Sequence, residues 1–342
     1  MTFIGSSLQE QVGLTNSRNL IVGAGPDLES LCRSGFYGWC FSHPGAIGGS
    51  QDELRFNSRR LHALMPQSTS RTLAHWRIEP GFDIFDICTK AEPGTLHCHP
   101  TYNFGCVLEG AAQLDIGGKT IPQPMGSVVL LNAFDAHAST WLERENRYFV
   151  IYANDDAWSE LLDRTHAHES LRFIEPVTDD NILFHMPRGI RLELHARPAN
   201  VGLADIACLL QFCISRGKAR EHGSAPRDMP EAQAILQNLS PDPTAETAEG
   251  VIRVEEVATQ LGMSRFQLSR LCLANHGIQP RRLKLQLMVA RAQLEISQGT
   301  SLTDAALAAG FSDQSHMSRE FRKTIGMTPR EYQDVITPLP RD

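Results

Sequence analysis

The 342-residue sequence lacks several features that mark other classes of protein. It has no apolar run near the roughly 18 residues that a membrane-spanning helix needs, so we expect no membrane partner. Residues 1–11 lack the basic start and the apolar core of a secretory signal, which favours a cytoplasmic protein. The eight cysteines form no Cys-x-x-Cys pair, so we expect thiols rather than a disulfide framework.

Positive charge is also scarce overall, because the net charge is -7. Its distribution is uneven. Residues 251–342 contain 12 basic and 9 acidic side chains, whereas residues 1–250 carry a net charge of -10. The whole-chain value argues against a nucleic-acid partner, but the basic C-terminal part favours a polyanion as its partner.

The length predicts two domains at roughly 150 residues each. Glycine and serine interrupt residues 1–70, which we interpret as an N-terminal arm or extension. Residues 71–216 are expected to form a β-rich domain that ends in helices. Residues 217–252, rich in Pro, Thr, Glu and Ala near their end, are expected to be a linker with a short helix at 231–239. Residues 253–335 are expected to be helical throughout.

The first domain has the pattern of an antiparallel β-structure. Short alternating segments are separated by turn signals such as Pro80-Gly81 and Gly117-Gly118. The expected strands are Thr72–Ile78, Phe82–Cys88, Phe104–Leu108, Gln113–Ile116, Ser127–Leu131, Ala138–Leu142 and Tyr148–Tyr152. Seven strands at this spacing predict a sandwich or barrel. Helices are expected at 155–164 and 200–216, the second with an apolar stripe at Leu203, Ile206, Ala207 and Leu210.

The helical part contains a repeat. The segment Val254–Ser264 aligns with Leu302–Ser312, and each has apolar residues at i, i+3, i+4 and i+7, then glycine, one apolar residue and serine. Glycine favours the left-handed position that ends a helix, and serine caps the helix that follows. Each segment therefore predicts a helix, a tight turn and a second helix.

The second helices of the two units also match, at Leu268-Ser269-Arg270 and Met317-Ser318-Arg319. One face is expected to be buried, with Leu268, Leu271, Cys272, Met317 and Phe321. The opposite face carries residue types that bond to base edges and phosphates. These candidate DNA contacts are Arg265, Phe266, Ser269, Arg270, Gln314, Ser315, His316, Ser318 and Arg319. A bundle that binds only protein is the alternative, and two tandem units with arginines on their outer faces argue against it.

A helix from Arg281 to Ser297 is expected between the units, with a buried stripe at Leu283, Leu287, Ala290 and Leu294. At 1.5 Å per residue it is roughly 26 Å long, so with its flanks it can hold two reading helices about one turn of DNA apart. Its basic residues, Arg281, Arg282, Lys284 and Arg291, are candidates for contacts with backbone phosphate.

Residues 228–335 closely resemble the DNA-binding domain of AraC/XylS-type transcription regulators. The second unit, Gly310–Phe321 followed by Gly326-Met-Thr-Pro329, follows the family signature, with Met317 where an aromatic residue is common. Cys272 and Met288 also depart from the usual pattern. The resemblance implies a bipartite reader of the major groove that usually activates transcription.

The β-domain carries His97-Cys98-His99, whose two imidazoles are expected on one side of a strand, followed by Asn103, Gly110, Gly126 and His137. This arrangement resembles a cupin. The resemblance implies a β-barrel in which three histidines and a glutamate surround a divalent metal. Asn103 stands in the place of the carboxylate. AraC-type regulators commonly carry such a domain as their sensor, so the resemblance favours sensing over catalysis.

Three interpretations of His97, His99, Asn103 and His137 remain open. They line a pocket for a small-molecule effector, or they hold a divalent metal, or they are packing residues at strand ends. The cofactor is unknown, and a divalent metal is one candidate because three imidazoles with water form a valid site.

We therefore interpret the chain as an α+β multidomain protein, with a cupin-like β-barrel and an all-α domain of two helix-turn-helix units. The expected function is that of a non-enzymatic, effector-responsive activator of transcription. Its expected partners are double-stranded DNA, a small-molecule effector, RNA polymerase and a second copy bound through the helix at 200–216. The alternative is a metal-dependent cupin enzyme, or a metal sensor, fused to a DNA-binding domain.

Overall fold

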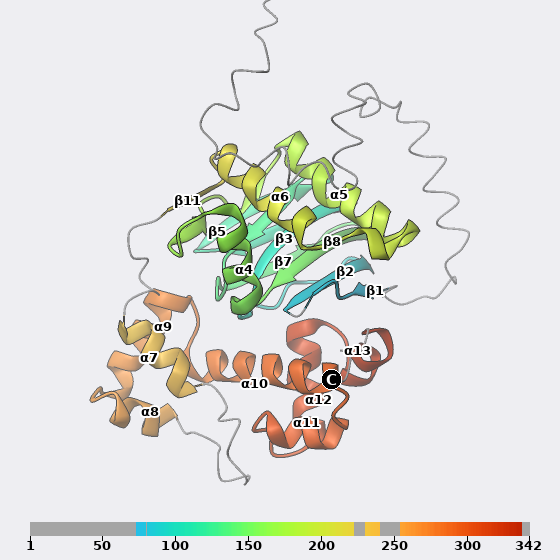
Figure 1. Cartoon of the computed structure of the whole chain (residues 1–342). Coiled ribbons are helices and arrows are strands. Elements are labelled where there is room, and N and C mark those ends of the chain that lie inside the picture. The colour runs from blue at the N-terminus through green and yellow to red at the C-terminus, as the bar shows by residue number, and fades with distance from the viewer. Residues whose placement is uncertain (1–72, 80, 222–229, 240–253, 337–342) are drawn as a thin grey trace, which may run out of the picture.

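The computed structural model describes residues 73–79, 81–221, 230–239 and 254–336 (Figure 1). The expected arm at 1–70 lies outside these residues. Among the helices in the described part of the chain, none is both long and apolar enough to cross a membrane.

The first half of the described chain consists mainly of antiparallel strands. They are β1 (Leu73–Trp76), β2 (Phe82–Thr89), β3 (Tyr102–Glu109), β4 (Ala111–Ile116), β5 (Lys119–Pro124), β6 (Val128–Leu131), β7 (His137–Trp141), β8 (Asn146–Ala153), β9 (Leu171–Phe173), β10 (Val177–Thr178) and β11 (Ala219–Glu221). A six-stranded sheet has the order β1-β2-β8-β3-β6-β10, a three-stranded sheet the order β5-β4-β7, and β11 pairs with β9. This is the expected cupin-like β-fold.

All seven predicted strands are present, and each end lies within two residues of its predicted position. Four short strands were not predicted: β5, β9, β10 and β11. β5 contains Pro122 and Pro124, which disfavour a strand, but it is an edge strand that pairs only with β4, where the missing N–H groups cost little.

Three helices cover one face of the six-stranded sheet: α4 (Asp155–Thr165), α5 (Asn181–Ala196) and α6 (Leu203–Ser215) (Figure 1). The main core lies between this face and the helices, with Phe104, Phe149 and Ile151 from the sheet and Leu161 and Leu210 from the helices. The sequence predicted α4 and α6 but not α5.

The expectation that residues 200–216 form the dimer contact needs correction. The stripe of Leu203, Ile206, Ala207 and Leu210 is buried against the chain's own core, as are most other residues of α6. Little of this helix remains for a second copy, because the domain core already uses its apolar face.

A buried ionic cluster fixes α5 to the sheet. The carboxylate of Asp86 in β2 accepts hydrogen bonds from Arg147 (3.0 and 2.8 Å), from Arg191 of α5 (2.7 Å) and from His195 of α5 (2.8 Å). Burial alone would raise the pKa of Asp86, but these donors and their charges outweigh it and hold that pKa well below its ordinary range. Asp86 is therefore ionised, and it ties two elements together.

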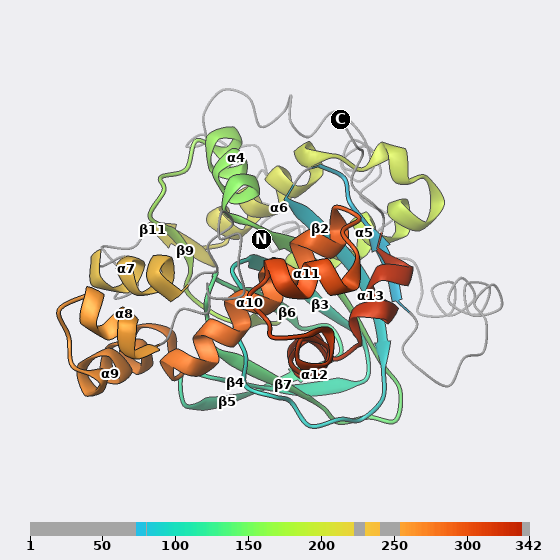
Figure 2. The ribbon, with the colours of Figure 1, turned by 90° about the horizontal axis from the view of Figure 1, so that it is seen from below.

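The second half is helical, with α7 (Pro230–Leu239), α8 (Val254–Gln260), α9 (Arg265–His276), α10 (Pro280–Ser297), α11 (Leu302–Ala308), α12 (Gln314–Ile325) and α13 (Pro329–Val335). α10 joins two groups of helices, α7–α9 at one end and α11–α13 at the other (Figures 1 and 2). The expected turns are present, since Gly262 and Gly310 have φ of 65° and 80°.

The expected packing inside each helix-turn-helix unit is confirmed. Ala258, Ala306 and Ala309 are buried where the helices cross, and Leu268 and Phe321 are buried beneath the second helices. One capping prediction was wrong. Ser264 caps α9, but Asp313 rather than Ser312 caps α12, because its side chain accepts a hydrogen bond from the His316 amide.

Two further expectations need correction. On α10, Leu294 is exposed, and the buried residues near its C-terminal end are Ala292 and Ile296. The expected linker at 217–252 is too long. β11 pairs with β9 and belongs to the barrel domain, and α7 contacts α8, α9 and α10 and belongs to the helical domain.

Candidate functional site

The first candidate site is the outer face of α9, which carries four of the nine predicted DNA contacts. Arg265 and Arg270 are exposed and Ser269 is half-buried. Phe266 is 81% exposed, which is unusual for a large aromatic side chain that has no partner surface. The Arg265 guanidinium lies 6.0 Å from the Phe266 ring and 3.7 Å from Glu255. An arginine and an aromatic ring are thus presented together.

The matching face of α12 is equally accessible. Gln314, Ser315 and Arg319 are exposed, and His316 and Ser318 are half-buried. Two of these side chains also have internal contacts. The Gln314 carbonyl accepts a hydrogen bond from Thr303 (3.2 Å), and the His316 ring lies edge-on to Phe311, 5.2 Å away. His316 therefore supports the turn between α11 and α12 as well as facing outward.

The basic residues of α10 divide into two groups. Arg281 is exposed, as a phosphate contact requires. Arg282 instead donates to the Leu96 carbonyl of the barrel at 3.3 Å and lies 3.5 Å from Glu320, and Arg291 is paired with Glu295 at 2.6 Å. Arg282 and Arg291 are engaged within the protein in this structure, which the sequence pattern did not indicate.

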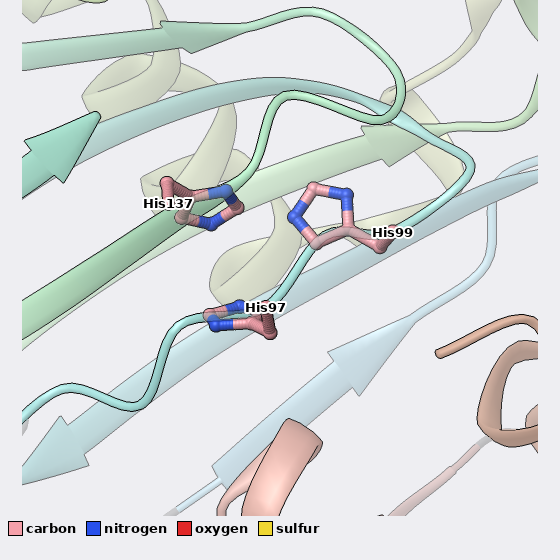
Figure 3. A group of neighbouring side chains, drawn as sticks. All are labelled: His97, His99 and His137. Atoms are coloured by element: carbon pink, nitrogen blue, oxygen red, sulfur yellow. The ribbon is translucent and has the colours of Figure 1, made fainter. Parts of the chain in front are cut away.

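The second candidate site is formed by His97, His99 and His137, which the structure brings together (Figure 3). One nitrogen from each ring lies within 4.8 Å of the others. A pair of backbone hydrogen bonds joins His97 to His137, at 2.9 and 2.8 Å, so that the two residues lie opposite each other. The expected strand through His97 and His99 is absent, and both residues lie on a loop before β3.

Each imidazole is oriented through its Nδ1 atom. Nδ1 of His97 lies 2.8 Å from the Thr95 carbonyl, and Nδ1 of His137 lies 2.7 Å from the Asp135 carbonyl. A carbonyl only accepts, so these Nδ1 atoms carry the proton and the Nε2 lone pairs stay available. Nδ1 of His99 bonds to the Thr101 hydroxyl at 2.9 Å. This is the orientation that histidines have when they coordinate a metal.

All three imidazoles are neutral near pH 7. Burial is the main cause, and it acts together with repulsion from a neighbouring histidine. These effects lower the pKa of His97, His99 and His137 from the ordinary 6.5 to about 3. Neutral imidazoles accept hydrogen bonds or coordinate metals, so this cluster suits a cation or a hydrogen-bond donor rather than an anion.

Asn103, the fourth predicted member, is also part of the cluster. It is buried, and its amide nitrogen lies 3.2 Å from Nε2 of His99. An amide at this position satisfies the imidazole without adding charge. The three-histidine donor set therefore fits a metal that prefers imidazole nitrogen, and it lacks the carboxylate that would strengthen binding.

A structured turn positions His137. Asn132 donates to the Phe173 carbonyl and accepts from the Phe173 amide, and the Asp135 carboxylate accepts from the Asn132 amide at 2.9 Å. Within this turn Phe134 has a φ of 62°, a left-handed conformation that costs energy for a non-glycine residue. No sequence signal pointed to Thr95, Thr101 or Asp135 as orienting groups, because their contacts depend on the folded turns.

Comparison with known proteins matches both halves. A family described as AraC-like ligand binding domain matches residues 88–207, and one described as Helix-turn-helix domain matches residues 257–334. The bifunctional transcriptional activator/DNA repair enzyme Ada of Escherichia coli (strain K12) is 33% identical over 85 residues, or 25% of this chain and 24% of Ada. The HTH-type transcriptional activator RhaS of Escherichia coli O139:H28 is 38% identical over 79 residues, or 22% of this chain and 28% of RhaS. These alignments span only about a quarter of each relative.

Among solved structures, ToxT from Vibrio cholerae O395 matches with a TM-score of 0.54 at 15% identity, covering 76% of this chain and all of ToxT. A structure of ToxT from Vibrio cholerae strain SCE256, with bound unsaturated fatty acid, matches with a TM-score of 0.52 at 14% identity, covering 78% of this chain and all of ToxT. At these identities the likeness concerns the fold, a barrel domain followed by two helix-turn-helix units.

Proposed function

We propose that the chain is an AraC-type transcription regulator, which binds a specific DNA sequence and regulates transcription in response to an effector held in its barrel. DNA binding is expected because the chain contains a helix-turn-helix domain, and effector binding because it contains an AraC-like ligand binding domain.

The observation that carries this proposal is the pair of exposed reading faces on α9 and α12, joined by α10. At 1.5 Å per residue, the 18 residues of α10 extend about 27 Å, and the flanking turns add to this length. Two reading helices at such a separation suit two successive major grooves on one side of a duplex. The proposed contacts are Arg265, Phe266, Ser269, Arg270, Gln314, Ser315, His316, Ser318 and Arg319.

The effector is expected at His97, His99, Asn103 and His137. These residues share one small space, and their ring nitrogens are oriented by neighbouring oxygen atoms. ToxT, whose fold is similar, has been solved with a bound unsaturated fatty acid. The polar, nitrogen-lined cluster here suits a different chemistry.

We further propose that the chain acts in the cytoplasm as a homodimer that contacts RNA polymerase and activates transcription. The dimer contact is not assigned to α6, which is buried in its own chain. α5 is the better candidate, because Ile182 and Leu192 are exposed on it, by 45% and 37%.

A metal-dependent cupin enzyme is the rival function. Regulators of this family are typically not enzymes, and the match to the bifunctional Ada covers only the helix-turn-helix region. Asn103 in the carboxylate position also argues against an enzyme. With an amide there, none of the four cluster residues is a carboxylate that could act as a general base at neutral pH.

The test is selection of bound sequences from a random duplex library by the full chain, followed by footprinting. We expect a site of two half-sites whose centres lie about one helical turn apart. Binding that shows no preference among sequences would overturn the proposal. So would a single half-site that is unaffected by changes in α12.

A further inference from the structure

We propose that the ligand of the histidine cluster is a divalent transition-metal ion, and that the contacts of α9 and α10 with the two histidine loops transmit its binding to the DNA-reading helices. This inference rests on the proposed function, and it names the ligand class and the regulation of the same site.

The first step is the shape of the cluster. The ring centroids of His97 and His137 lie 4.4 Å apart, and those of His99 and His137 lie 5.0 Å apart. Two nitrogens bound to one ion at about 2.1 Å each lie at most about 4.2 Å apart, so small ring rotations suffice to close the set on an ion. The His99 ring lies edge-on to Tyr152 at 5.4 Å, so an aromatic side chain already occupies one side. The space suits an ion better than a sugar or a fatty acid.

The donor chemistry selects the class of ion. Three neutral imidazole nitrogens suit zinc, copper, iron or nickel, and do not suit calcium or magnesium, which prefer oxygen. Asn103 must rotate its amide away from His99, or present its oxygen, when the ion binds. Without a carboxylate, we expect an affinity suited to reversible sensing rather than permanent retention.

The second step is the position of the cluster, whose loops lie against the helical domain. Arg282 of α10 donates to the carbonyl of Leu96, directly before His97. When the Gln286 side-chain amide is turned over, so that its nitrogen and oxygen each meet a complementary group, its nitrogen donates to the carbonyl of Cys98 at 3.3 Å, directly after His97, and its oxygen accepts from Arg282 at 3.2 Å. Two side chains of α10 therefore hold the backbone on both sides of one ligand.

The loop that carries His137 packs against the end of α9. The strained Phe134 lies 6.1 Å from the ring of His276, near the end of α9. Gly277 follows, and a Cβ atom on it would lie 3.0 Å from the Cβ of Ala136. Both histidine loops thus contact the helical domain, one through α10 and the other through the end of α9.

The contacts continue to the second reading helix. Arg282 also lies 3.5 Å from Glu320, which is buried on the inner side of α12. The same guanidinium therefore faces the first ligand of the cluster and the second recognition helix. Its charge already disfavours positive charge on His97.

The direction of the effect follows from this charge. A divalent ion among the histidines repels the Arg282 guanidinium, and this repulsion weakens the contact of α10 with Leu96. We therefore expect metal binding to loosen the docked helical domain, so that its two units adapt more easily to DNA. By linkage, any change that releases α10 also strengthens metal binding.

The first experiment measures metal binding alone, without DNA. Full-length protein freed of metal by chelation is dialysed against zinc, nickel or cobalt chloride, and bound metal is determined by mass spectrometry. We expect about one ion per chain for wild type and for His168→Ala, an exposed histidine outside the cluster, and at least tenfold weaker binding for His99→Ala. Substoichiometric binding to wild type overturns the inference, whatever the folding of the variants. Equal binding to the two variants does so as well.

The second experiment tests the transmission. Operator affinity is measured with and without zinc for wild type, Arg282→Ala and its neighbour Arg281→Ala. We expect zinc to raise wild-type affinity about fivefold or more, the lower end of ordinary coupling. We expect Arg281→Ala to keep the ratio of operator affinity with zinc to that without zinc, even if DNA binding itself is weaker. We expect Arg282→Ala to show a smaller ratio and to bind zinc more tightly. A ratio near one for wild type, or an equal ratio for the two variants, contradicts the transmission. Failure of DNA binding in every condition contradicts instead the proposed function.

Discussion

His97 and His137 face each other across a bridge in which the backbone amide of each donates to the carbonyl of the other. The bridge joins a loop of the chain before β3 to the start of β7, 40 residues later, so the pair depends on the closed barrel. A site built in this way exists only in the folded domain. Its ligand must therefore stabilise the native state.

A carboxylate restored at position 103 is expected to tighten metal binding. Asn103→Asp has nearly the same volume and places an anionic oxygen near His99, where the amide now lies. We expect at least tenfold higher zinc affinity by isothermal titration. Asn181→Asp, at an exposed position on α5 away from the cluster, serves as a control for added charge alone. An equal gain in the two variants would show that position 103 is not part of the coordination.

Loss of one arginine from the proposed DNA-binding face is expected to change specificity. If Arg319 reads a base, Arg319→Ala costs about 1–3 kcal/mol of binding free energy and relaxes the preference at one position. Arg322→Ala, one turn further along α12 and also exposed, is the matched control. Competition assays with single-base operator variants distinguish the outcomes. Uniform weakening across all variants would assign Arg319 to phosphate.

The Asp86 cluster is expected to dominate the stability of the barrel domain. Asp86→Asn leaves Arg147 and Arg191 buried without their counter-ion, which typically costs about 3–5 kcal/mol. Urea unfolding measures the loss. Glu160→Gln, which breaks an exposed pair with Arg164, should cost less than about 1 kcal/mol. Similar midpoints for the two variants would contradict the importance of the cluster.

The same cluster predicts acid sensitivity. The pKa of Asp86 is lower in the folded chain than its ordinary 3.8, so its contribution to stability is complete above that value. The contribution is lost as the pH falls below about 3.8, because protons then bind the unfolded chain first. Unfolding midpoints between pH 5 and pH 3 should fall less steeply for Asp86→Asn than for wild type.

The histidine cluster predicts a second, earlier pH effect in the metal-free protein. Each imidazole has a folded pKa near 3 against an ordinary 6.5, so stability is constant above about pH 6.5 and falls below it. Between pH 6.5 and pH 5, each histidine that stays neutral in the folded chain lowers the free energy of unfolding by up to about 2 kcal/mol. Thermal unfolding with a chelator present measures the decline. His99→Gln should reduce its slope, and an unchanged slope would contradict the burial of the ring.

The helix-turn-helix units were predictable because their signals are local. The glycines at 262 and 310 and the alanines at 306 and 309 are spaced by the geometry of one helix pair. Leu294 was misplaced because the period of an isolated helix does not show which side its neighbours cover. On α10 those neighbours include α11 and α12.

The helix α5 was missed although a signal was present. Pro187 and Gly189 interrupt the expected helical composition, yet Asp180 caps the helix through hydrogen bonds from the amides of Ile182 and Leu183. The apolar residues Leu183, Met186, Ile190 and Leu194 also follow the helical period, and all are buried. Burial of this face against the sheet outweighs the low helix propensity of proline and glycine.

For the site, the sequence predicted which residues meet but not what surrounds them. The spacing of His97 and His99 placed two imidazoles together, and the resemblance to a cupin added the third histidine at 137. The contacts of Arg282 with the barrel and with α12 were not predicted, because an arginine on a helix between two helix-turn-helix units has the same local pattern whether it faces phosphate or protein. Only the tertiary position of Leu96 and Glu320 distinguishes the two.

The fixed length of α10 restricts the promoters that this regulator can use. The helix fixes the distance between α9 and α12, because its 18 residues cannot be stretched to reach a half-site at another spacing. Each base pair inserted between the half-sites turns the second one by roughly 35° around the duplex. A few insertions therefore carry it out of reach of α12. New target genes arise more readily by base changes inside correctly spaced half-sites than by insertions or deletions between them.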